Sequence, residues 1–445
     1  VVKYLTESSN GQYVLGTGDF YEFVHDQVQQ AAYTLIDEKS RPSKHLEIGR
    51  LLLSGTKETE LEERVFDIVT HYNLGADFLT DQAEKVRAAE LNLIAGRKAR
   101  LAAAFAASIA YLKLGLSLLG EKMWQNHYRL TLDLHNELIE ACYQNSQYQD
   151  VKTLFGTIIE HARQDIDAAI AHKTMIKSRT IVNEPAEAIR IAEEYLEKLD
   201  VSLDQIRESD LSVDELYELP PMEDHEKLAA LEVLVAITTT VTMFTPERLP
   251  SVIFTMLNII SRHGNSTVSS FAYVHYAMHL CFARQYDDGN RFGQLAADLL
   301  EKYPIQGRAS QIVNMRCTWV SHWRHSVHDL TAPLKTYHRM AMQEGDIEWS
   351  LYTLANYTTF LLTSGVPLEF CLSEAELGIH LCQTWNQEFT QLVFLMFAQS
   401  ALNLTGRSAN PIQLEGKWFS EESMLPKLEG NHMLITAYGL LKMTL

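Results

Sequence analysis

The stretches that decide the fold are residues 148–155, with the sequence YQDVKTLF, and residues 185–192, with the sequence PAEAIRIA. In each stretch the fourth and eighth residues are small or apolar, so they lie on adjacent turns along one face of a helix. The first residue of each stretch stands where a turn from a preceding helix would end. The two stretches therefore predict the second helices of two successive helix pairs.

The same spacing occurs earlier in the chain, at Ala107 and Tyr111. The motifs at Ala107, Val151 and Ala188 are 44 and 37 residues apart, which predicts a degenerate tetratricopeptide-like repeat rather than a strict 34-residue one. Amphipathic helical patterns fill about 61–199 and resume over about 226–404. We therefore predict an all-α fold, a tetratricopeptide-like α–α superhelix or solenoid.

Both ends of the chain differ from this pattern. Residues 13–15 and 20–24 predict two short strands around a Gly-rich turn, and a helix follows, as in a small winged-helix unit. We predict a winged-helix remnant over 1–55, a first helical array over 56–199 and a second over 228–445 that is truncated at its end. The chain lacks an initiator Met and stops inside an apolar pattern, so we expect a piece of a longer polypeptide.

Residues 200–227 interrupt the helical pattern. They hold ten acidic residues against Arg207 and Lys227, together with Pro220-Pro221. We predict an acidic linker that breaks the chain into two arrays, and the alternative is a docking strip for a basic partner segment. Residues 238–242 (TTTVT) favour a strand by composition, but the periodicity around them predicts a helix.

Composition excludes several classes of function. Hydrophobic content of 46% with 21% charged residues is typical of a folded globular protein. A formal charge of -19 disfavours binding to nucleic acid or to anionic lipid. The five cysteines are scattered without a C-x-x-C pair, which favours reduced thiols and a cytoplasmic location. The most apolar window, 101–119, contains Lys113, so no membrane-spanning segment is predicted.

Sequence motifs for catalysis are missing. The chain has no G-x-x-x-x-G-K-[ST], H-E-x-x-H, G-x-S-x-G, H-R-D or D-F-G, so we predict no catalytic residue and no cofactor within it. His322, His325 and His328, with His338 beyond, have the spacing of metal ligands on a helix but lack a well-placed acidic ligand. We predict no metal site there; a metal-dependent enzyme using His322 and His325 remains an alternative.

Aromatic residues are concentrated in the second array. We predict that Tyr273, Tyr276, Trp319 and Trp323 form a protein-binding surface on its concave face, because exposed aromatic anchors supply much of the binding energy at interfaces.

A family resemblance rests on longer runs of sequence. Residues 20–33 (FYEFVHDQVQQAAY) and 45–52 (HLEIGRLL) resemble the end of the ATPase module in very large bacterial and fungal signalling proteins. Those proteins join a serine/threonine kinase-like domain, a STAND-type ATPase, a helical repeat region, a GAF sensor and a histidine kinase. Further matches are 91–99 (LNLIAGRKA), 264–266 (GNS), 270–274 (SFAYV), 292–296 (FGQLA) and 344–346 (EGD).

The resemblance implies that this chain is the winged-helix end of the ATPase and the repeat region after it. It implies a non-catalytic scaffold that contacts other proteins or adjoining domains and couples the ATPase to a sensor and kinase. In such ATPases a His-Asp pair can touch the bound nucleotide, so His25 is implied as a nucleotide sensor that acts only with the missing ATPase domain. Kinase motifs are not matched here. The alternative is a solenoid that senses a small-molecule effector and regulates the adjacent ATPase, which a closed aromatic pocket would favour.

Overall fold

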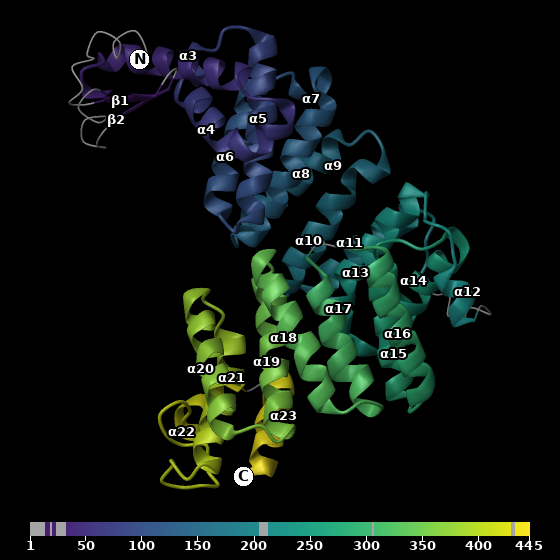
Figure 1. Ribbon diagram of the computed structural model, residues 1–445. Helices are drawn as coiled ribbons and strands as arrows, with labels where there is room; N and C mark the ends of the chain where they lie inside the picture. The colour runs from purple at the N-terminus through teal and green to yellow at the C-terminus, as the bar shows by residue number, and fades with distance from the viewer. Residues whose placement is uncertain (1–13, 18–19, 24–32, 204–211, 305–306, 429–431) are drawn as a thin grey trace. The chain divides into compact units, whose positions relative to one another are not determined.

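The computed structural model describes residues 14–17, 20–23, 33–203, 212–304, 307–428 and 432–445, which are helical apart from one hairpin (Figure 1). The chain packs as two compact units. Unit 1 comprises residues 1–100 and 104–147, and unit 2 comprises residues 101–103 and 148–445. Many consecutive helices pack on one another in pairs, and the predicted all-α, tetratricopeptide-like fold class is confirmed.

Unit 1 begins with a two-stranded antiparallel hairpin in which Val14 pairs with Phe23 and Thr17 with Phe20, as the sequence predicted. Its elements are β1 (Val14–Thr17), β2 (Phe20–Phe23), α3 (Arg41–Ser54), α4 (Leu61–Leu74), α5 (Gln82–Leu101), α6 (Phe105–Leu119), α7 (Met123–Asn126) and α8 (Tyr128–Gln144), with short 3₁₀ turns at Glu38–Ser40, Glu58–Glu60 and Ala76–Phe78. The predicted winged helix includes residues 1–13, 18–19 and 24–32, which lie outside the described residues, so it stays a prediction.

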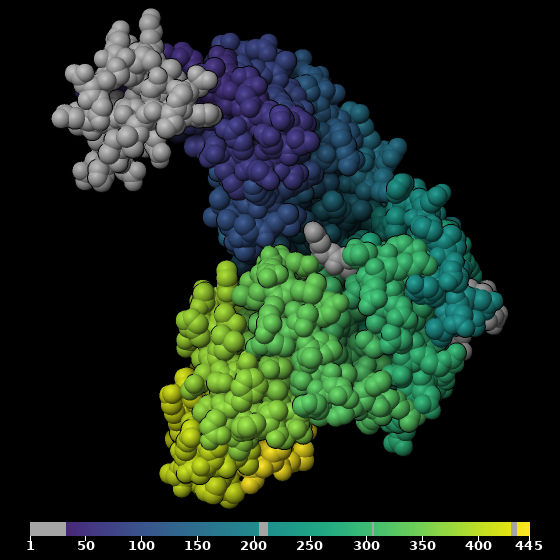
Figure 2. Space-filling view, viewed as in Figure 1, coloured from purple at the N-terminus to yellow at the C-terminus, as the bar shows by residue number. Residues whose placement is uncertain are grey.

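Unit 2 continues the helix pairs. Its elements are α9 (Tyr148–His161), α10 (Ala169–Ile181), α11 (Pro185–Lys198), α12 (Val213–Tyr217), α13 (His225–Phe244), α14 (Leu249–His263), α15 (Ser269–Phe282), α16 (Tyr286–Lys302), α17 (Ala309–Met315), α18 (Val327–Gln343), α19 (Ile347–Thr363), α20 (Leu368–Thr384), α21 (Glu388–Leu404), α22 (Glu421–Met424) and α23 (His432–Thr444). A π-helical segment (Arg316–Val320) and 3₁₀ turns at Asp165–Ala168, Pro246–Arg248, Ser321–Trp323 and Leu425–Leu428 complete it. Figure 2 shows successive segments of unit 2 lying side by side from teal to yellow.

Several connections between helices share one kind of turn. After a helix ends, a residue adopts a left-handed conformation, and the next N–H bonds a carbonyl of the last helical turn. Gln147 N donates to Cys142 O at 2.8 Å, and Gln285 N donates to Leu280 O at 2.8 Å. The left-handed residues at such turns are Ala103, Ser146, Asn183, Asp200, Arg284, Gly345, Asn386 and Gly406. Most are not glycine, so the repeat is clearer in conformation than in sequence.

The predicted repeat motif is shifted by one residue in α6. Ala107 is exposed, whereas Ser108 is buried and its hydroxyl donates to Gly96 O at 2.8 Å. Four residues on, Leu112 is buried against Gly96, where a Cβ would lie 2.6 Å from the leucine. Placing the motif at Ala107 and Tyr111 was wrong because the small residues before it stand on every face of the helix and hide the amphipathic pattern.

The acidic segment does not separate two arrays, contrary to the prediction. Its described residues belong to unit 2, the packing divides the chain between Gln147 and Tyr148, and α10 and α11 both pack on α13. Asn265 forms hydrogen bonds with this segment. Its N–H donates to Pro220 O, its carbonyl accepts from Met222 N, and its side-chain amide donates to Leu216 O, each at 2.7 Å. These bonds fix residues 216–222 of the acidic segment as part of the packed array.

Helix α13 contains the run 238–242, which is helical as predicted. The hydroxyl of Thr238 donates to Leu234 O and that of Thr242 donates to Thr238 O, each at 2.7 Å, so these polar groups are satisfied inside the helix. Among the described helices, α13 is the one long and apolar enough to cross a bilayer, and 61% of its apolar window is buried within the protein. Such burial is typical of a core helix.

Candidate functional site

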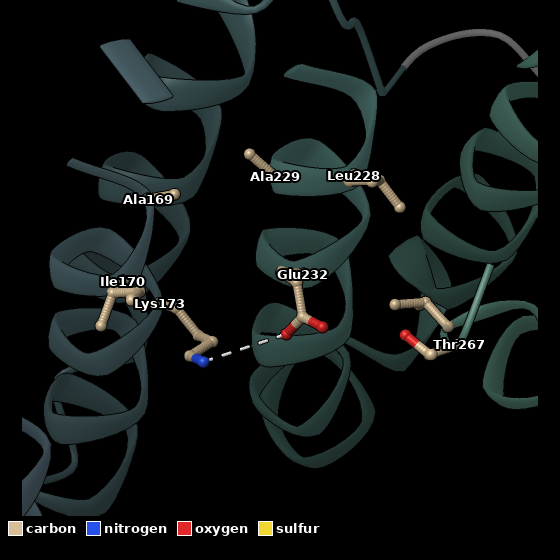
Figure 3. A pocket seen from close by; sticks show the side chains of 8 residues that line it. Ala169, Ile170, Lys173, Leu228, Ala229, Glu232 and Thr267 are labelled. Atoms are coloured by element: carbon tan, nitrogen blue, oxygen red, sulfur yellow. Dashed lines mark ion pairs between the residues drawn. The ribbon is translucent and has the colours of Figure 1, made fainter. Parts of the chain in front are cut away.

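A groove of about 270 Å³ lies between α10 and α13, beside the start of α15. Figure 3 shows Glu232 of α13 between Lys173 of α10 and Thr267. Small and aliphatic side chains, among them Ala169 and Leu228, form the rest of the wall. The groove therefore has apolar sides with one carboxylate between them.

Cations surround the carboxylate of Glu232. Lys173 Nζ lies 4.0 Å from Oε2, and Arg308 Nη1 donates to Oε1 at 3.1 Å. The side chains of Lys173 and Arg308 are 18% and 16% exposed, and that of Glu232 is 30% exposed. Burial alone would raise the pKa of Glu232, but Arg308, followed by Lys173 and Lys177, outweighs it and holds the pKa below its ordinary value. A carboxylate that is ionised and paired in this way links helices and is poorly suited to act as a general base.

We expect Glu232→Ala to lower the free energy of unfolding of the whole chain by about 1–3 kcal/mol, because Arg308 would stay largely buried without its partner. Urea denaturation followed by circular dichroism measures this. The matched control is Glu193→Ala, which breaks an ion pair with Arg248 whose side chains are 40% and 37% exposed. The control should cost less than about 1 kcal/mol. Equal losses from both variants would refute the linking role of Glu232.

A second feature of unit 2 is exposed and aromatic. Phe282, Tyr286, Trp319 and Trp323 form what we call the aromatic patch. Tyr286 and Trp323 stack with ring centroids 4.6 Å apart, and Phe282 meets Trp319 edge-on at 5.9 Å. Phe282, Trp319 and Trp323 are 64%, 45% and 49% exposed. Large apolar side chains gathered at the surface in this way are typical of a protein-binding site.

Local backbone structure positions the patch. The π-helical segment Arg316–Val320 follows α17 and carries Trp319, and Val320 then leaves helical geometry at φ -122° and ψ -63°. Single π turns are frequent at functional sites. Gly293 of α16 permits the close approach, since a Cβ there would lie 2.9 Å from Val320 Cγ1. An ion pair of 2.6 Å between Arg324 and Asp287 links the residues that directly follow Trp323 and Tyr286.

Of the four residues predicted to bind a partner, two are exposed and two are packed inside the unit. Trp319 and Trp323 are in the patch, but Tyr273 is 1% exposed, so placing it on a binding surface was wrong. Tyr276 is partly buried with its ring 4.7 Å from Phe292 and 5.7 Å from Phe254, which makes it a packing residue between α14, α15 and α16.

Sequence reasoning missed two members of the patch. Phe282 and Tyr286 flank the turn between α15 and α16, and aromatic residues on both sides of a three-residue turn were the available signal. His25 lies outside the described residues, and its nucleotide-sensing role stays a prediction.

The histidines considered as metal ligands have other surroundings. The ring of His322 lies 4.7 Å from that of Trp323, and burial lowers its pKa. His338 is buried, and Ser350 Oγ lies 2.9 Å from its Nδ1. In the part of the chain that the structure describes, no three His, Cys, Asp or Glu side chains are placed to hold a metal ion. This geometry gives no support to an enzyme built on His322 and His325.

Comparison with curated proteins relates the chain to a signalling kinase. It is 23% identical over 425 residues to hybrid signal transduction histidine kinase G of Dictyostelium discoideum. The chain is similar to one segment of that kinase. The match covers 78% of this chain and 12% of the kinase, so the chain spans a small part of its relative. No protein-family model matches the chain.

Two solved structures match the chain with TM-scores below 0.5. One is a signal transduction ATPase with numerous domains (STAND) and a tetratricopeptide repeat sensor from Pyrococcus horikoshii, 12% identical, with a TM-score of 0.47 over 99% of this chain and 60% of that chain. The other is the Cut9–Hcn1 hetero-tetramer of the APC/C, 10% identical, with a TM-score of 0.23 over 91% of this chain and 92% of that chain. The repeat assignment stands on the helix pairs themselves.

Proposed function

We propose that this chain is a non-catalytic helical-repeat module of a signal-transduction kinase, and that it binds an adjoining domain or partner protein through the aromatic patch. The observation that carries the proposal is the similarity over 425 residues to a hybrid histidine kinase. The patch supports it by offering exposed aromatic side chains, which are the usual anchors of protein interfaces.

The parent polypeptide, on this proposal, also carries a STAND-type ATPase before the repeats and a sensor with a histidine or serine/threonine kinase after them. Residues 1–55 would be the winged-helix end of the ATPase. The helix pairs would pass a change in nucleotide state to the kinase by altering how they stack. A cytoplasmic location agrees with the five cysteines, all of which are buried thiols.

A protein partner suits the described residues better than a small effector. The groove at Glu232 is lined by no aromatic ring, and a second groove, beside Tyr217, is lined mostly by charged side chains. Ligand pockets usually enclose their ligand with apolar and aromatic walls. In the part of unit 2 that the structure describes, the exposed aromatic rings of the patch lie on the surface, where a protein can reach them.

Two assays test the proposal. The isolated chain should neither hydrolyse ATP nor phosphorylate itself, because phosphoryl transfer needs positioned phosphate-binding groups and Mg²⁺ ligands. In the parent protein, replacing both Trp319 and Trp323 with Ala should uncouple kinase activity from the nucleotide state of the ATPase while each activity persists alone. ATP turnover by the pure chain would overturn the non-catalytic proposal, and intact coupling in the double variant would overturn the role of the patch.

For His25 we expect an effect only in the longer protein. His25→Ala should leave the melting temperature of the isolated chain nearly unchanged and weaken ADP retention when the ATPase domain is present. A filter-binding assay measures ADP retention. The control is His127→Ala, at the residue directly before α8. Equal ADP retention by His25→Ala and the parent sequence would reduce His25 to a structural residue.

A further inference from the structure

Two histidines meet between α3 and α4 in unit 1. Nδ1 of His45 lies 2.8 Å from Nδ1 of His71, and Tyr33, which precedes α3, places its hydroxyl 3.1 Å from Nε2 of His45. A neutral arrangement satisfies every contact. In it Tyr33 donates to His45 Nε2, His45 donates from Nδ1 and His71 accepts at Nδ1, and the arrangement with each donor and acceptor exchanged holds the same number of protons. The two rings are therefore joined through a single hydrogen atom.

Counting protons shows how many the pair can hold. A first added proton can sit on His45 Nε2, because Tyr33 can then accept instead of donate, and the bond between the rings persists. A second proton must go to His71 Nδ1. Both Nδ1 atoms would then be donors at 2.8 Å, and two positive rings would repel one another. The geometry accommodates one extra proton and is incompatible with two.

Close packing leaves little room to relieve that repulsion. A Cβ at Gly75, just after α4, would lie 2.7 Å from Leu46 Cβ and from Pro42 O of α3. A Cβ at Gly49 would lie 2.9 Å from the ring of Tyr72. The helices touch along the same face that carries the histidines. Because the two backbones are already in contact, separating the rings with their side-chain conformations unchanged requires α3 to move away from α4.

Neighbouring charges act on the pair in opposite directions. Burial lowers the pKa of His45; burial and then the charge of His45 lower that of His71, whereas Asp67 of α4 raises it. The guanidinium of Arg41 lies 4.9 Å from the ring of Tyr33. Lys44 and Glu47 of α3, also nearby, pair with each other at 2.8 Å in solvent.

We propose that the His45–His71 contact makes the docking of α3 on α4 proton-dependent, so that acidification opens this helix pair while the rest of the chain stays folded. The pKa values of both rings lie below 6.5 in the folded protein. The contact therefore contributes its full stability above pH 6.5, and this contribution is lost as the pH falls through 6.5 toward the lower folded values.

Hydrogen exchange of the whole chain, measured by mass spectrometry at about pH 7.5 and pH 5 and corrected for intrinsic exchange, tests this. We expect protection in peptides from α3 and α4 to fall at least about tenfold at the lower pH. Peptides from α20 should keep their protection. In His71→Gln the ratio between the two pH values should be close to one, and the exposed control His380→Gln should behave as the parent does.

Equal pH ratios in the parent chain and in His71→Gln would overturn the proposal. Should His71→Gln fail to fold, NMR titration of the histidine rings in the parent chain decides the matter. Two separate protonation steps, the second coinciding with loss of α3 protection, support the proposal. Independent titration of both rings near 6.5 contradicts it.

Discussion

Gly264→Ala should lower the free energy of unfolding by about 2–4 kcal/mol, the largest stability effect that we expect from a single added methyl group in this chain. Gly264 ends α14 at φ +104°, a conformation that residues with a Cβ rarely adopt. A Cβ there would also lie 2.2 Å from Pro220 O, the carbonyl that accepts from Asn265 N. The acidic segment would have to leave its place or the backbone would have to bend. Urea denaturation followed by circular dichroism measures the loss.

Gly365→Ala is the matched control for that change. Gly365 has a similarly positive φ of +78°, but a Cβ there would meet no atom within 4 Å. Its cost should be about 1 kcal/mol, from backbone strain alone. If both variants lowered the free energy of unfolding by the same small amount, the close approach of Pro220 to Gly264 would be wrong. The docking of the acidic segment would then be wrong as well.

Trp323→Ala should weaken binding to the partner or adjoining domain at least about tenfold, which corresponds to 1.4 kcal/mol or more, with little change in melting temperature. The side chain is 49% exposed, so it contributes little to the core, and an aromatic anchor buried on binding contributes much to an interface. Isothermal titration calorimetry of the chain against each neighbouring segment of the parent polypeptide gives the affinity ratio.

Trp385→Ala serves as the control for this experiment, because Trp385 is also exposed, at 39%, but lies at the end of α20. It should bind as tightly as the parent sequence. If Trp385→Ala weakened binding as much as Trp323→Ala, the effect would come from losing any surface tryptophan, and the aromatic patch would have no special role.

Helix positions could be predicted from sequence because amphipathic periodicity is a local property. The helical pattern predicted over about 226–404 coincides with the run of helices from α13 to α21. The predicted register of the repeat motif was wrong in α6, where alanines leave no polar face. The predicted break at 200–227 also failed, because acidic composition indicates solvation and does not reveal the tertiary hydrogen bonds of Asn265.

Two of the four residues predicted to form a binding surface, Trp319 and Trp323, are exposed. Nearly every residue of α15, by contrast, is buried, and a mostly apolar helix gives no sign of which aromatic side chain reaches the surface. Tyr273 and Tyr276 are packed by α14 and α16, which no local pattern specifies. Conversely, Phe282 joins Trp319 across 37 residues of sequence, a contact that only the packing of the helix pairs creates.

The most direct test of the central claim is to make the segments that flank this chain in its reading frame as separate folded proteins and to measure their binding to the isolated chain. We predict that at least one binds with a dissociation constant of about 10 μM or tighter, that the Trp319→Ala, Trp323→Ala double variant abolishes this binding, and that the chain alone turns over no ATP. If neither folded neighbour bound the chain, or if the chain itself hydrolysed ATP, the proposed role as a non-catalytic interaction module would be wrong.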